Sequence, residues 1–205
     1  MLYGNNVRDL LIRLGRARLF QAKWTNQILD ETFAAIRTQR PDIDPAKLDE
    51  VRSRMIRGIR DCLVLGYEDL IESVKGIPDP DDRHVVAAAI KSHAHVIVTY
   101  NLKDFPDAAH KKFGMEAVHP DDFVLSQIDL DEDAVLDVLQ QLSENWRGNP
   151  SIPQVLEQLE TEFPKTVAAL RGRDDRQVRR LAGALKARAK SGYEGFRGTR
   201  EHRGS

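Results

Sequence analysis

Apolar residues recur at helical spacing from the start of the chain, and short β runs interrupt the helices. Val7, Leu10 and Leu14 share one face of a predicted amphipathic helix. Thr25 is typical of an N-cap, and the helix that it begins should run through Ile36. Further helices are predicted after the cap at 44–45, at 67–71, over 83–91 and after the turn at 119–122.

The strand candidates are short apolar runs bounded by turn residues. They lie at 18–24, 62–65, 95–100 and 115–118. The run at 95–100 is continuous, as expected for a buried parallel strand. Because helices separate these runs, the sequence predicts an α/β domain with a mostly parallel sheet.

Beyond about Ile128 the strand signals stop and only helical patterns remain. One of these helices should begin at a capping box formed by Ser151 and Gln154. From Ser191 onward glycines and charged residues dominate, which predicts disorder. We therefore expect an α/β domain over residues 1–126, a helical extension over 127–190 and a disordered basic tail over 191–205.

Composition limits the class of protein. The chain has 205 residues, of which 41% are hydrophobic and 31% charged. The lone cysteine, Cys62, rules out an internal disulfide framework or a multi-cysteine metal site. No apolar run approaches the ~20 residues that span a bilayer, and the N-terminus lacks a signal-peptide layout. We expect a cytoplasmic protein with no membrane association.

The formal net charge of −1 conceals an uneven distribution. Residues 171–205 hold eleven Lys or Arg and four Asp or Glu, a net charge of +7, which leaves −8 for the preceding residues. This distribution fits an acidic metal site combined with a polyanionic partner. It fits equally an ordinary acidic domain that carries a solvated tail.

Acidic and amide side chains follow or precede the strand candidates. Asn101 and Asp104 come after the run that ends at Tyr100, Asp82 begins the helix that leads into it, and Glu31 lies inside the helix after Trp24. Ligands gather at the carboxyl ends of strands in open α/β sheets. Carboxylates that converge there would repel one another unless a divalent cation such as Mg²⁺ or Mn²⁺ neutralised them.

Each of these residues also has a structural explanation. Asp82 could have no role beyond capping its helix, because helix N-termini favour acidic residues. Asp104 could be a turn residue before Phe105 and Pro106, and Glu31, next to Asp30, could lie on a solvated face. The combination on three separate elements favours function over these alternatives.

Two stretches together resemble the PIN-domain nucleases. They are 78–90, in which an Asp opens a helix of small residues, and 96–105, in which a strand ending in Val-Thr precedes Asn101 and a downstream Asp-Phe. The match is closest to the VapC-like branch, the toxins of type II toxin–antitoxin systems. The segments at 24–31 and 7–11 also resemble this family, and the resemblance covers about residues 2–125. The helical remainder resembles a C-terminal extension found in one subgroup.

The resemblance implies a three-layer PIN-like fold and a metal-dependent endoribonuclease. It implies that Glu31, Asp82 and Asp104 hold Mg²⁺ or Mn²⁺, which activates water for attack on an RNA phosphodiester. Asn101 would be a neutral ligand or a nearby donor, and Thr99 would help to hold the site. We expect phosphate contacts from basic residues near the site, and the candidates are Arg8, Arg83 and Lys103. The resemblance also implies an antitoxin partner and allows a homodimer.

One feature departs from the family pattern. PIN domains begin with a hydrophobic strand that ends in Asp, and here Met1-Leu2-Tyr3 stands where that strand should just have ended. Either the start of the chain lies further upstream, or the protein lacks a ligand that the chemistry needs. The second possibility leads to an alternative hypothesis, a non-catalytic PIN-like module that binds RNA or a partner protein through its basic C-terminal helices. In a third possibility the tail is merely solvated and the extension packs a homodimer.

Overall fold

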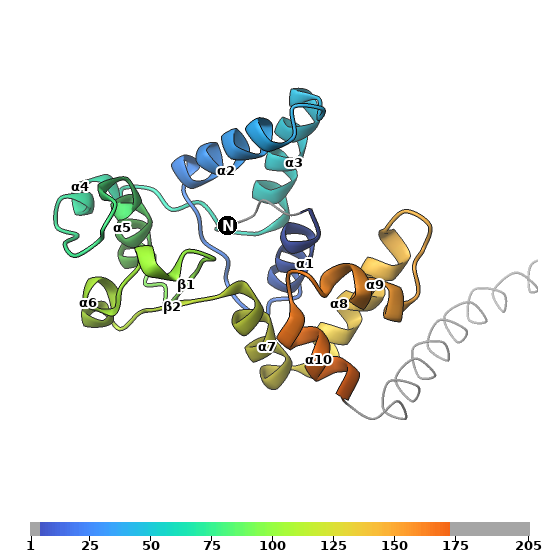
Figure 1. The fold of residues 1–205 in the computed structure, drawn as a ribbon. Helices are drawn as coiled ribbons and strands as arrows, with labels where there is room; N and C mark the ends of the chain where they lie inside the picture. The colour runs from blue at the N-terminus through green and yellow to red at the C-terminus, as the bar shows by residue number, and fades with distance from the viewer. Residues whose placement is uncertain (1–4, 173–205) are drawn as a thin grey trace, which may run out of the picture. The chain divides into compact units, whose positions relative to one another are not determined.

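The computed structural model describes residues 5–172 (Figure 1). Its helices are α1 (Asn5–Arg16), α2 (Asn26–Gln39), α3 (Pro45–Gly58), α4 (Glu68–Ile71), α5 (Arg83–Lys91), α6 (Asp107–His110), α7 (Pro120–Leu130), α8 (Glu132–Asn145), α9 (Ile152–Leu159) and α10 (Pro164–Gly172). Its strands are β1 (Val96–Val98) and β2 (Glu116–Val118), and its 3₁₀ turns are η1 (Pro80–Asp82), η2 (Leu102–Asp104) and η3 (Lys111–Phe113). The chain divides into two units that meet between Thr166 and Val167, and the described part of the second unit is residues 167–172.

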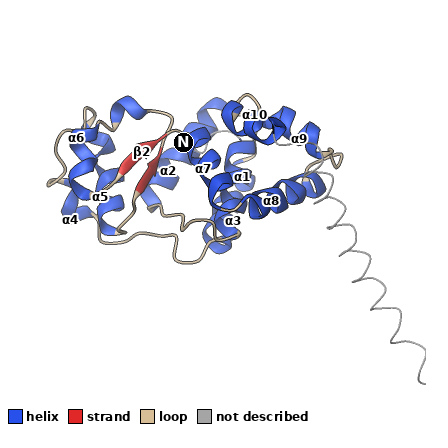
Figure 2. Cartoon of the chain, turned by 90° about the horizontal axis from the view of Figure 1, so that it is seen from below, coloured by secondary structure: helices blue, strands red, loops and turns tan. Residues whose placement is uncertain are grey.

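The strands pair in parallel, which confirms the α/β class. Val96, Ile97 and Val98 of β1 stand opposite Glu116, Ala117 and Val118 of β2. Figure 2 shows this pair beside α5 and α6, and both helices contact it. The buried strand predicted at 95–100 is shorter and less buried than expected, because β1 spans only Val96–Val98 and of these only Ile97 is buried.

The two earlier strand candidates shrink to one parallel bridge between Trp24 and Leu63. The N–H of Trp24 donates to the carbonyl of Cys62 at 2.9 Å, and the N–H of Val64 donates back to Trp24 at 2.9 Å. Left-handed backbone at Asp61 (φ 54°) and Gly66 (φ 67°) confines the second segment to four residues. Strand extent was therefore predicted too generously here.

Helix starts follow the predicted caps. The Thr25 hydroxyl accepts a hydrogen bond from the N–H of Ile28 at 3.0 Å, and the Asp44 carboxylate accepts from Ala46 at 2.9 Å. The capping box at Ser151 is also present, with the side chain of Gln154 accepting from the backbone N–H of Ser151 at 2.8 Å. These contacts are local, and local sequence was sufficient to predict them.

Two apolar clusters support the first half of the chain. One joins the helix α5 to β1 and the following loops, with Val86, Ile97 and Phe105 among its buried members. The other lies between α2 and α3 and includes Trp24 and Phe33. Further along, α8 packs against both α1 and α9. The predicted domain boundary at 126/127 stays a prediction, and residues 173–205, with the basic tail, lie outside the described residues.

Candidate functional site

The carboxylate of Asp82 is influenced by two predicted acids from other elements, Asp104 and Glu31. Asp82 ends η1, Asp104 ends η2 and Glu31 lies on α2. The pKa of Asp82 is raised above its usual value, mainly by burial and then by the negative charges of Asp104, Asp79 and Glu31. Because the interaction of two charges weakens with distance, Asp104 and Glu31 lie near enough to Asp82 to act on its carboxylate.

The side chain of Asp82 does not cap its helix. It occupies the N-cap position of α5 but forms no capping hydrogen bond there. The local cap comes from Asp79, whose carboxylate accepts from the N–H of Asp81 at 2.9 Å. Capping by its side chain therefore does not explain Asp82, and within residues 5–172 its carboxylate is not used by the helix as a hydrogen-bond acceptor.

Glu31 and the adjacent Asp30 have different surroundings. Asp30 pairs with Arg52 at 2.8 Å, on the side of α2 that faces α3. Glu31 is about half exposed and accepts a hydrogen bond from the Gln27 side chain at 3.1 Å. Gln27 in turn accepts from the hydroxyl of Tyr67 at 3.2 Å. The carboxylate of Glu31 is thus oriented by the amide of Gln27, and no arginine among residues 5–172 pairs with it.

The turn after β1 is held by the buried residue Thr99. Its N–H donates to the carbonyl of Val118 at 2.9 Å, which ties the turn to β2. Its hydroxyl accepts from the N–H of Asn101 at 3.1 Å. The carbonyl of Asn101 accepts from the N–H of Asp104 at 3.0 Å. This chain of bonds fixes the backbone that carries Asn101, which is exposed, and Asp104, which is half-buried.

The predicted phosphate-binding residues are spread over different surroundings. Lys103 is exposed on η2, next to Asp104. Arg83 is half-buried beside Asp82, and its Nε atom is buried with no hydrogen-bond partner among the described residues. Arg8 is only 9% exposed, and burial lowers the pKa of its guanidinium. It lines a separate cavity that includes none of the three acids.

His84 was not selected by sequence reasoning, which noted only scattered histidines without zinc spacing. It is 2% exposed, and its Nε2 atom lies 3.2 Å from a carboxylate oxygen of Glu31. Neither ring nitrogen has a partner in hydrogen-bond geometry within residues 5–172. A usable signal was present, because helical spacing places His84 on the buried face of α5 with Ala87 and Ala88.

The predicted ligands are carboxylate oxygens and the amide oxygen of Asn101. These are the types of oxygen ligand that Mg²⁺ and Mn²⁺ bind. A half-buried carboxylate whose pKa is raised by burial and by like charges is a position where a cation would relieve repulsion. In the described part of the chain, however, no three His, Cys, Asp or Glu side chains are grouped closely enough to hold a metal ion. Glu31, Asp82 and Asp104 therefore do not form a complete set of metal ligands within residues 5–172.

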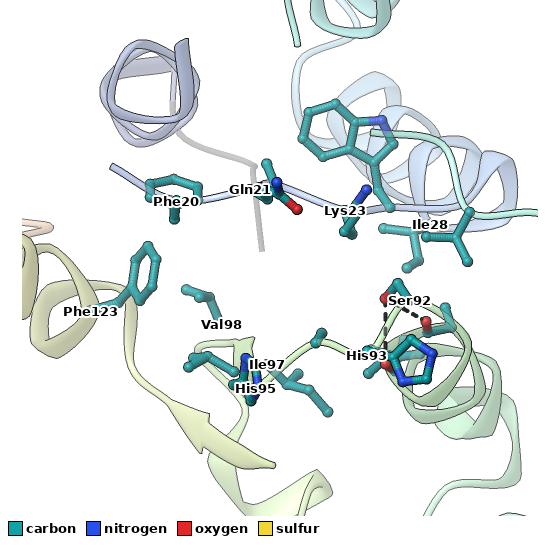
Figure 3. Close-up of a pocket in the computed structure, with 18 of the residues that line it drawn as sticks. Phe20, Gln21, Lys23, Ile28, Ser92, His93, His95, Ile97, Val98 and Phe123 are labelled. Carbon is teal, nitrogen blue, oxygen red and sulfur yellow. Dashed lines mark hydrogen bonds between the residues drawn. The ribbon is translucent and has the colours of Figure 1, made fainter. Parts of the chain in front are cut away.

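A largely apolar cavity of about 490 Å³ lies between residues 20–24, which include Trp24 of the isolated bridge, and β1 (Figure 3). Phe20, Gln21 and Lys23 line one side, and Ile97 and Val98 line the other. At one end the rings of Phe20 and Phe123 meet edge to face, with centroids 4.8 Å apart. This cavity includes none of the three acids. It accounts for the partial exposure of Val96 and Val98.

Comparison with known proteins identifies the chain. A model of the PIN domain matches residues 2–103, and a model described as the VapC50 C-terminal domain matches residues 120–172. Over 115 residues the chain is 40% identical to the protein named Putative ribonuclease VapC50 from Mycobacterium tuberculosis (strain ATCC 25618 / H37Rv). This match covers 56% of the present chain and 67% of that protein. No solved structure matches.

The α/β fold is therefore that of a PIN-domain protein. Within that class, the chain belongs to the VapC-like family, as the resemblance of its motifs predicted. Among the described residues, no helix is both long and apolar enough to cross a membrane.

Proposed function

We propose that this chain is a metal-dependent endoribonuclease and the toxin of a type II toxin–antitoxin system, acting in the cytoplasm with a cognate antitoxin as its partner. The observation that carries the proposal is that Asp104 and Glu31, which come from two other elements, both help to raise the pKa of Asp82. The similarity to a protein named as a ribonuclease supports it. A homodimer remains an expectation of the same proposal.

In this proposal the three carboxylates hold Mg²⁺ or Mn²⁺, which supplies activation of a water molecule and stabilisation of the leaving oxygen. Asn101 offers an amide oxygen at the exposed edge of the site. Thr99 acts indirectly, because its hydroxyl holds the backbone N–H of Asn101. Lys103 and Arg83 are the basic residues nearest in sequence to the acids, and we assign them phosphate contacts.

The test is cleavage of a structured RNA pool in the presence of Mg²⁺, Mn²⁺ or EDTA. We expect cleavage with either cation and none with EDTA. Asp82→Asn should lower the rate by at least about 100-fold, since a neutral amide binds a divalent cation far less well than a carboxylate. Asp81→Asn is the matched control, because Asp81 is the exposed neighbour whose backbone N–H is already bound by Asp79. Equal activity in the parent and in Asp82→Asn would contradict the site.

A second candidate function is a non-catalytic PIN-like module that binds RNA or a partner protein. The observation that favours it is that the three acids do not form a closed ligand group within residues 5–172. The same assay separates the two candidates when it also includes a version of the chain extended before Met1 by an apolar strand ending in Asp. Cleavage by either version supports the nuclease. No cleavage by either version, together with retained RNA binding, supports the binding module.

A further inference from the structure

A cavity of about 580 Å³ lies beside α1, α3 and the end of α8, and its lining is strongly basic. Among the described residues, five arginines and one carboxylate, that of Asp9, contribute to it. The arginines are Arg8, Arg13, Arg16, Arg54 and Arg147. We call this cavity, with its five arginines, the arginine cleft. The helix α1 forms its centre, because α1 contacts both α3 and α8 (Figure 1).

The single carboxylate in the lining is already engaged. Asp9 pairs with Arg13 at 2.9 Å and accepts a hydrogen bond from the indole N–H of Trp146 at 2.8 Å. Arg54 pairs with Glu50 of its own helix at 2.8 Å. Arg16 and Arg147 are exposed, and neither forms an ion pair within the described residues. Positive charge in the cleft therefore exceeds the negative charge available to balance it.

The surrounding structure holds these cations in place. Arg16 lies in the last turn of α1, where the helix dipole favours positive charge. Its Cδ atom lies 3.8 Å from the position where a Cβ at Gly58 would stand, so its stem extends along the end of α3. The buried Arg8 forms part of the wall, and Trp146, fixed by Asp9, adds an aromatic ring to the lining.

We infer that the arginine cleft binds the phosphate backbone of an RNA strand outside the cleavage site, an inference that rests on the proposed action on RNA. Guanidinium groups bind phosphate oxygens through paired N–H donors, and they are less strongly hydrated than lysine. An aromatic ring next to such groups gives a base a surface for stacking. The cleft contains none of Glu31, Asp82 or Asp104, so it would hold RNA that flanks the bond to be cut. An acidic peptide would satisfy the charge but would leave the ring without a matching group.

The test measures binding of a fluorescein-labelled single-stranded RNA by anisotropy in EDTA, where metal-dependent cleavage cannot interfere. The variant is Arg16→Ala with Arg147→Ala in the full chain. The control is Arg37→Ala with Arg60→Ala, which removes the same charge from exposed arginines outside the cleft. Because all four arginines are exposed, we expect every variant to fold, and circular dichroism checks this.

Removal of two phosphate contacts should lower RNA affinity at least about tenfold and reduce the slope of log K against log salt by about 1.4. The control should keep the parent slope. Equal losses in the two double variants, or no RNA binding by the parent, would overturn the inference. The competing occupant, an acidic peptide, is tested with a labelled oligoglutamate in the same assay. If Arg16→Ala with Arg147→Ala keeps the RNA affinity of the parent but no longer binds this peptide, the inference is also overturned. If RNA binding depends on the cleft but no version of the chain cleaves RNA, the proposed nuclease activity is refuted and the inferred RNA-binding role of the cleft still holds.

Discussion

The negative charge of Asp82 is disfavoured by its surroundings, and this has a consequence for stability. Its pKa is raised in the folded protein, first by burial and then by nearby carboxylates. The folded state therefore binds a proton more tightly than the unfolded state does. The stability that this protonation contributes is present below the unfolded pKa of about 3.9 and is lost as pH rises through the folded pKa. At neutral pH the ionised Asp82 destabilises the fold.

We expect Asp82→Asn to raise the melting temperature at pH 7 in EDTA by about 1–2 °C, because the amide removes the repelled charge and keeps the shape. The difference from the parent should shrink as pH falls through the folded pKa of Asp82, because the parent carboxyl then also becomes neutral. Thermal unfolding across this pH range measures it, with Asp81→Asn as the control. A lower melting temperature for Asp82→Asn at pH 7 would show that the carboxylate is structural.

Sequence patterns single out the candidate acids but not all of their neighbours. Asn101 and Asp104 are candidates because they follow a strand whose carboxyl end lies at one edge of the sheet, and Asp82 because it begins the helix that leads into that strand. The contact of His84 with Glu31 joins positions 53 residues apart on two helices. Its detection requires knowledge of how α2 and α5 pack, which periodicity does not supply.

At the scale of elements, Asp121 shows how a residue typical of a local cap serves a distant helix. The cap of α7 is His119, whose Nδ1 accepts from the N–H of Asp121 at 3.2 Å. The carboxylate of Asp121 is 1% exposed and accepts from the N–H groups of Lys165 and Thr166 at 2.8 and 2.9 Å. These amides belong to the first turn of α10, so Asp121 satisfies donors that this helix leaves open.

We expect Asp121→Ala to lower the free energy of unfolding by about 1–3 kcal/mol, because two backbone donors lose a buried charged acceptor. Asp122→Ala provides the comparison. Asp122 pairs with the Lys165 side chain at 2.6 Å on the surface, and such pairs contribute less than about 1 kcal/mol. Urea unfolding of both variants measures the difference. Equal losses would mean that the charge on α7, and not the contact with the amides, stabilises this region.

Helices were predicted better than strands for a physical reason. A helix makes its hydrogen bonds within one segment, so the caps at Thr25, Asp44 and Ser151 could be identified locally. A strand exists only where a second segment pairs with it. The segments around Trp24 and Leu63 have strand-like composition but share one bridge, and β1 pairs with β2 alone among the described residues.

At the scale of the molecule, the parallel pairings fall into two groups with a cavity between them. The bridge at Trp24 lies on one side of the apolar cavity, and β1 lies on the other (Figure 3). The β1 residues Val96 and Val98, which the sequence predicted to be buried, line this cavity and are partly exposed. An extended apolar segment placed there could pair with the free edge of β1 and cover those side chains, since both walls are built from extended backbone.

A version of the chain with an apolar strand of about five residues and a short linker before Met1 should therefore be more stable than the chain itself. Burial of two or three more side chains offsets the cost of ordering the added segment, and a net gain of about 2 kcal/mol would raise the melting temperature by about 4–8 °C. The matched control is an extension of equal length with proline at its centre, which cannot pair along both edges. Trp24 lines the cavity, so its fluorescence should shift with the apolar extension alone. Equal melting temperatures for the two extensions would show that the cavity does not accept a strand. In that case, any cleavage activity regained with the extension that ends in Asp would come from the added carboxylate alone.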